Sequence, residues 1–157
     1  MDTTFINARV VTLDGIRDNA AVGVRNGRIV SVGPMDQAAG AAARTDSPDR
    51  GSEVIDLAGD YLAPGFIDLH IHGVQDALVD KGAEDVARMS TILSRYGVTG
   101  FLPTVVPPPV GEDEKLLEAV GHLEAPAASV LGIFFEGPYL GYTGAIPEDA
   151  LGSPDRG

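Results

Sequence analysis

The stretch "PGFIDLHIHG" (residues 64–73) has the length and apolar content of a buried strand, yet it carries three polar side chains. Side chains two residues apart on a strand point to the same side of the sheet. The stretch therefore predicts two faces, one with Asp68, His70 and His72 and the other with Ile67, Leu69 and Ile71. We expect the aliphatic face to pack beneath helices and the polar face to point into the interior of the fold.

Downstream of this strand the pattern alternates between helix and strand. Helices are predicted over 82–97 and 111–125 and strands over 98–106 and 128–136, with a Gly/Pro-rich loop over 137–157. Short apolar strands separated by helices are typical of a parallel sheet with helices outside it. A complete (β/α)8 barrel has eight such units in about 250 residues. Residues 64–157 are therefore interpreted as the first three units of a barrel that is truncated.

Upstream of Pro64 the sequence predicts a small β-domain over residues 1–63, which resembles part of a β-sandwich. A strand is expected over 5–13 and a hairpin over 20–33, in which Asn26 and Gly27 form the turn. A loop is expected over 36–52, and one or two short strands follow it. The predicted fold class is α/β, with a β-domain in front of an incomplete barrel.

The composition limits the partners of the chain. Its 157 residues carry a formal net charge of -12, with 11 basic and 23 acidic side chains and no basic stripe. Such a surface repels phosphate backbones and anionic lipid, so we expect neither nucleic acid nor a membrane as partner. There is no cysteine, so a metal would need His, Asp or Glu as ligands. The N-terminus lacks the features of a secretory signal, and a cytoplasmic location is expected.

Three side chains at strand ends are candidates for binding a cation. His70 and His72 end the first predicted strand of the barrel, and Glu136 ends the third. Two imidazoles and a carboxylate at the same rim suit a divalent metal. The alternatives are histidines satisfied within the core and a solvated carboxylate. Asp68 either orients a histidine ring or has a structural role, and His122 is expected on the surface of a helix.

The motifs carry a family resemblance. The strings "VIDLAGDYLAPGFIDLHIHG" and "YGVTGFLPTVV", followed by "LGIFFEGPYL", resemble the amidohydrolase superfamily. Within it the chain is most similar to the N-terminal portion of the N-acetylglucosamine-6-phosphate deacetylases. The resemblance implies a hydrolase of a C–N bond that releases acetate from an N-acetylated amino-sugar phosphate, a small-molecule substrate. It also implies a homo-oligomer when the protein is complete.

The resemblance further implies His70, His72 and Glu136 as ligands of one or two divalent ions, with zinc or iron suited to such ligands. Water activated at the site would attack the acetamide carbonyl. The resemblance implies that an aspartate from a later strand moves the proton, so no catalytic residue is expected in this chain. Residues that bind the sugar phosphate are not identified.

Two positions depart from the family pattern. Phe134 stands where the family string has histidine, and Ile146 stands where many relatives have histidine or glutamine. These departures leave open an amidohydrolase of another specificity, such as a cyclic amidase or a deaminase. The chain length leaves open a non-catalytic metal-binding fragment, and this chain is expected to be inactive alone.

Overall fold

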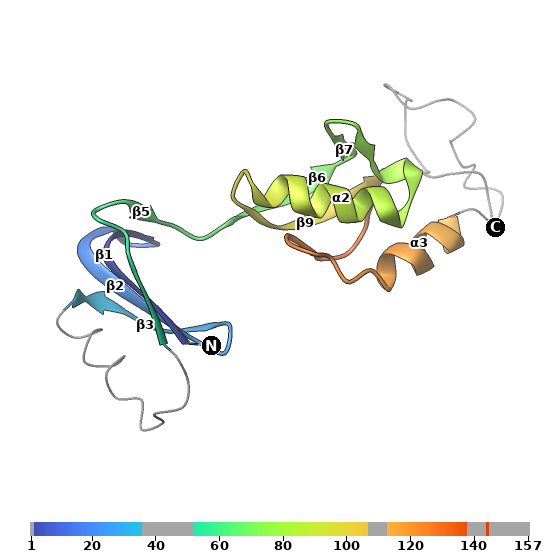
Figure 1. Ribbon diagram of the computed structural model, residues 1–157. Helices are drawn as coiled ribbons and strands as arrows, with labels where there is room; N and C mark the ends of the chain where they lie inside the picture. The colour runs from blue at the N-terminus through green and yellow to red at the C-terminus, as the bar shows by residue number, and fades with distance from the viewer. Residues whose placement is uncertain (1, 36–51, 107–112, 138–143, 145–157) are drawn as a thin grey trace. The chain divides into compact units, whose positions relative to one another are not determined.

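The chain forms two compact units, Met1–Pro64 and Gly65–Gly157. The computed structural model describes residues 2–35, 52–106, 113–137 and 144 (Figure 1). Nearly all of the loop expected over 36–52 lies outside these ranges, as does Ile146. Within the described ranges, no helix has the length and apolarity that crossing a bilayer requires.

The N-terminal unit is built on one sheet. Its strands are β1 (Asp2–Thr12), β2 (Gly15–Arg25), β3 (Arg28–Pro34), β4 (Ser52–Asp56) and β5 (Tyr61–Leu62). The strand order is β3-β2-β1-β4, and β5 also pairs with β1. The pairs β1–β2 and β2–β3 are antiparallel, whereas β4 and β5 run parallel to β1. The described residues of this unit form a single sheet, so a sandwich stays a prediction.

The predicted hairpin of this unit is confirmed. Asn26 and Gly27 have φ of 50° and 72°, and positive φ at both positions is the signature of a type I′ turn. The first strand of the hairpin starts earlier than predicted, at Gly15, because β1 turns back tightly after Thr12. A small core holds this sheet, formed by Ala8, Val10, Ala20 and Val22.

The C-terminal unit has the predicted β-α-β-α-β order. Its main elements are β6 (Phe66–Ile71), α2 (Ala83–Ser94), β9 (Val98–Val105), α3 (Asp113–Gly121), β10 (Ser129–Val130) and β11 (Phe134–Phe135). Strands β6, β10 and β11 all run parallel to β9. Gly100 and Phe101 pair with both β6 and β10, so β9 is the central strand. Gly97, with φ of 80°, lies between α2 and β9, where the sequence predicted a helix-terminating glycine.

Helix α2 buries its apolar side chains against β9. The core contains Val86, Met89 and Leu93 from the helix together with Phe101 and Val105 from the strand. The expectation that the aliphatic face of β6 lies beneath helices is wrong for two of its three residues. Ile71 packs against this core, but the side chains of Ile67 and Leu69 are exposed. The reason is that the described helices pack on β9, while β6 forms an edge of the described sheet.

The third predicted strand of this unit, over 128–136, is interrupted. It forms two short pieces, β10 and β11, and Gly132 lies between them with φ of 154°. Ser129 pairs with Gly100, but Phe134 pairs with Thr104, so the interrupted strand has one residue more than β9 over the same length. The bulge lies before Phe134, so the segment from Phe134 to Glu136 follows it without a further interruption.

Candidate metal centre

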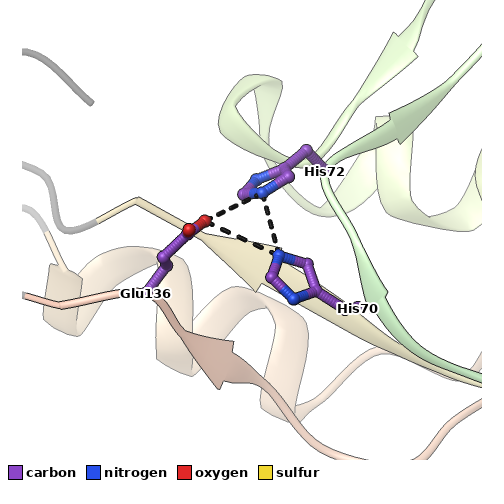
Figure 2. Close-up of side chains that lie close together, drawn as sticks. All are labelled: His70, His72 and Glu136. Carbon is purple, nitrogen blue, oxygen red and sulfur yellow. Dashed lines mark hydrogen bonds and ion pairs between the residues drawn. The ribbon is translucent and has the colours of Figure 1, made fainter. Parts of the chain in front are cut away.

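The structure brings His70, His72 and Glu136 together. The Nε2 atoms of the two imidazoles lie 3.2 Å apart. Glu136 Oε2 lies 3.0 Å from Nε2 of His72 and 3.6 Å from Nε2 of His70. Figure 2 shows that the three side chains point toward one another, the histidines from one side and the glutamate from the other. This is the one group of three such donors found among the described residues.

These distances fit a single divalent cation. Tetrahedral ligands placed about 2.0–2.1 Å from a zinc ion lie about 3.3 Å from one another. The three separations in the structure, 3.0, 3.2 and 3.6 Å, scatter around that value. Neutral imidazole nitrogen and carboxylate oxygen are also ligands that zinc and ferrous iron accept. The side chains are 34 to 50% exposed, so a fourth ligand from solvent or substrate has access.

The histidines are presented by the end of β6. Its register against β9 shifts between Asp68 and Ile71, because three steps along β6 cover two steps along β9. This is a β-bulge, a feature that redirects side chains and is common beside functional sites. The two imidazoles end up edge to face, with ring centroids 5.1 Å apart.

The segment after His72 holds the main chain of that residue. The His72 carbonyl accepts a hydrogen bond from Val79 N–H at 2.9 Å. Val79 begins the 3-10 helix η1 (Val79–Lys81), which follows a hairpin of two short strands, β7 (Gly73–Val74) and β8 (Ala77–Leu78). This hairpin could not be predicted from the sequence, because two-residue strands give no readable alternation.

Helix α2 anchors that hairpin through Asp85. Its carboxylate accepts a hydrogen bond from Leu78 N–H at 3.0 Å and a second from Arg88 at 3.1 Å. The Leu78 bond, followed by the nearby guanidinium, holds the pKa of Asp85 below its ordinary value. The hydrogen bond from Arg88 to Asp76, a residue of the hairpin, lowers the pKa of that carboxyl as well. The start of α2 therefore supports the segment that follows His72.

Glu136 is placed by the central strand from the opposite side. Its N–H donates to the Val105 carbonyl at 2.9 Å, directly after the paired residues of β11. Two residues before it, the ring of Phe134 lies 5.1 Å from the ring of His70, tilted by 35°. Phe134, which departs from the family string, thus packs on a candidate ligand, a contact that the sequence alone does not predict.

Asp68 and His122, which were also considered from the sequence, do not belong to the group of three donors. Asp68 accepts a hydrogen bond from the backbone N–H of His70 at 3.1 Å, so it contacts the main chain of that residue. His122 is exposed and lies just beyond the end of α3, away from the three donors that come together.

Comparison with known proteins supports the resemblance, and the matches cover part of the length of each relative. The chain is 28% identical over 155 residues to N-acetylglucosamine-6-phosphate deacetylase of Lysinibacillus sphaericus, covering 95% of this chain and 37% of the relative. Over 106 residues it is 37% identical to the Mus musculus enzyme of that name, covering 62% of this chain and 26% of the relative. No protein-family model matches.

The fold agrees with these relatives. The crystal structure of N-acetylglucosamine-6-phosphate deacetylase from Pasteurella multocida matches 99% of this chain and 40% of its own, with a TM-score of 0.76 and 27% identity. The chain spans between a quarter and two fifths of the length of these proteins. The resemblance to amidohydrolases of the N-acetylglucosamine-6-phosphate deacetylase type is confirmed in both sequence and fold.

Proposed function

We propose that this chain supplies a divalent-metal site to an amide hydrolase that removes acetate from N-acetylglucosamine 6-phosphate and leaves glucosamine 6-phosphate. The proposal rests on the donor triangle, the group formed by His70, His72 and Glu136. The ligand atoms of these three side chains lie within 4.8 Å of one another. The similarity to relatives named as deacetylases supports the reaction and the substrate.

The proposal includes an architecture. Residues 1–63 belong to a β-sandwich-like domain, and residues 64–157 form the first three units of a (β/α)8 barrel. The parallel pairing of β6, β10 and β11 around β9 supports the barrel, because it places the ends of β6 and β11 at one rim. A cytoplasmic location and a homo-oligomer of the complete protein are part of the same prediction.

In the proposed site, the residues of this chain bind the cation and fix its position. His70 and His72 would hold the cation through Nε2, and Glu136 would hold it through Oε2 and supply negative charge. When bound, a divalent ion such as zinc or ferrous iron polarises an amide carbonyl and lowers the pKa of water toward neutrality. We assign no proton carrier to the described residues, because the resemblance implies an aspartate from a later strand.

A second specificity is favoured by one observation. The ring of Phe134 lies against His70 and is 40% exposed, so an apolar surface borders the donor triangle. A planar cyclic amide can stack on such a surface. A cyclic amidase or a deaminase built on the same metal site is therefore the competing function.

Acetate release tests the proposal. The 157-residue chain and the longest protein encoded by its reading frame are each loaded with zinc or ferrous iron. Each is then given N-acetylglucosamine 6-phosphate, N-acetylglucosamine and a cyclic amide such as dihydrouracil. We expect the longer protein to release acetate from the phosphorylated sugar at least about tenfold faster than from the free sugar, a gain that one charged contact can supply.

Two outcomes would contradict the proposal. Ring opening of dihydrouracil without acetate release would favour the second specificity. A metal-loaded protein that hydrolyses none of these substrates would favour a metal-binding fragment without catalysis. Glu136→Gln serves as the matched variant, because it keeps the size of the side chain and removes the charge that the cation requires.

A further inference from the structure

A hydroxyl group on the central strand joins the two strands that carry the candidate ligands. Thr104 lies on β9, and its side chain is fully buried. Its Oγ1 accepts a hydrogen bond from the N–H of Ile71 at 2.9 Å. Ile71 lies between His70 and His72 in the sequence. The backbone of Thr104 pairs with Phe134, two residues before Glu136. Thr104 therefore contacts the main chain between the two histidines and also that of Phe134, near Glu136.

The Thr104 hydroxyl accepts from a main-chain N–H at the register shift of β6. Ile71 is paired with Pro103, and the register of β6 shifts just before this pair. In the bulge two consecutive N–H groups are bound by side chains, that of His70 by Asp68 and that of Ile71 by Thr104. These two side chains therefore stabilise the conformation of the bulge through hydrogen bonds to its main chain.

The Thr104 hydroxyl also has an acceptor of its own. It donates a long hydrogen bond to the carbonyl of Leu102 at 3.3 Å and retains a lone pair for Ile71 N–H. A group that both donates and accepts in a buried position holds its partners in one arrangement. The imidazoles on either side of Ile71 are then directed toward Glu136 before any ligand arrives.

We propose that Thr104 is a positioning residue of this centre, whose hydroxyl fixes the β6 bulge so that His70 and His72 face Glu136. The inference rests on the proposed metal site, but it concerns the metal-free chain as well. It assigns a role to a side chain that contacts neither metal nor substrate.

The test compares Thr104→Val, which keeps the shape and removes the hydroxyl, with Thr104→Ser, which keeps the hydroxyl. Thr99→Val on the same strand is the matched control, because the hydroxyl of Thr99 is exposed and donates a longer bond, 3.4 Å, to Phe66. Circular dichroism and urea unfolding establish that each variant folds. Amide hydrogen exchange at Ile71 and the imidazole ring resonances of His70 and His72 are measured by NMR in the metal-free 157-residue chain.

In the metal-free chain we expect Thr104→Val to speed exchange at Ile71 at least about tenfold and to shift both ring resonances, while Thr104→Ser and Thr99→Val do neither. In a Co²⁺ titration we expect Thr104→Val to weaken binding by about 10- to 100-fold and to alter the visible spectrum, with the serine variant close to wild type.

The two claims fail in different ways. If wild type binds no Co²⁺ or Zn²⁺, the proposed metal site is wrong, and the NMR comparison still decides whether Thr104 orients the imidazoles. If Thr104→Val folds and leaves the Ile71 exchange and the ring resonances unchanged, the positioning role is wrong even when wild type binds metal. A serine variant as defective as the valine variant would also overturn it.

Discussion

The two units of the chain obtain their geometry in different ways. In the N-terminal unit, β1, β2 and β3 pair as antiparallel neighbours joined by tight turns. In the C-terminal unit, every strand that carries a candidate ligand pairs with β9, and a helix separates it from β9 in sequence. The three antiparallel strands of the first unit can pair from local signals, whereas the second unit depends on a shared central strand. Changes in the second unit should therefore affect both stability and the donor triangle.

The largest effect is expected at Phe101. This side chain is fully buried, and its backbone pairs with strands on both sides of β9. Phe101→Ala should lower the free energy of unfolding by about 3–5 kcal/mol and weaken zinc binding, because a cavity would loosen the strand that spaces the donors. Urea unfolding and a zinc titration measure both. Tyr96→Ala, at an exposed aromatic, should change stability by less than about 0.5 kcal/mol; equal effects would contradict the central role of β9.

Ser90 should have the next largest effect. Its buried hydroxyl donates to the Ala128 carbonyl at 2.7 Å and accepts from Ala127 N–H at 3.1 Å, which joins α2 to the segment before β10. Ser90→Ala leaves both groups without this partner and should cost about 1–3 kcal/mol in urea unfolding. Ser94→Ala, which removes an exposed bond to Thr91 within the helix, should be close to neutral. Similar midpoints for the two variants would show that this link is unimportant.

A substitution in the hairpin turn of the N-terminal unit tests whether changes there affect stability alone. Gly27 has φ of 72° and open space where a Cβ would lie, so Gly27→Ala probes the backbone conformation alone. It should cost about 1 kcal/mol of stability. Gly33→Ala is the control, because it also has open space but lies on β3 without a positive φ. Zinc affinity should be unchanged in both, and a loss in either would mean that the units are coupled.

The smallest effect depends on pH. Because hydrogen bonds from Leu78 and Arg88 hold the pKa of Asp85 below its ordinary value, its contribution to stability is present above the unfolded-state pKa, about 3.9. That contribution is lost as the pH falls through the folded-state pKa. Asp85→Asn should therefore be less stable than wild type at pH 7 and should approach it near pH 2. Urea midpoints across this range test the trend. A difference between wild type and Asp85→Asn that stays constant down to pH 2 would contradict it.

The sequence predicted those features that depend on local chemistry. Asn26 and Gly27 specify their turn because both adopt positive φ, and Gly97 lies where the helix was expected to stop. His70, His72 and Glu136 could be assigned to one rim because the ends of parallel strands meet there. The assignment needed only strand periodicity and the alternation of helices and strands.

Features that depend on the partner strand could not be predicted in this way. The bulges in β6 and between β10 and β11 arise from register against β9, which no single segment encodes. The exposure of Ile67 and Leu69 depends on which helices cover β6. The role of Thr104 could not be predicted either, because its hydroxyl contacts Ile71 only through the pairing of β6 with β9.

Zinc binding by the 157-residue chain shows directly whether His70 and His72 are metal ligands. Competition with a chromophoric chelator gives the affinity of wild type, of the double variant His70→Ala/His72→Ala and of His122→Ala, which removes the one other histidine of the chain. We expect the double variant to bind zinc about 100-fold more weakly or not at all, and His122→Ala to bind it as wild type does. A double variant with wild-type zinc affinity would contradict this expectation.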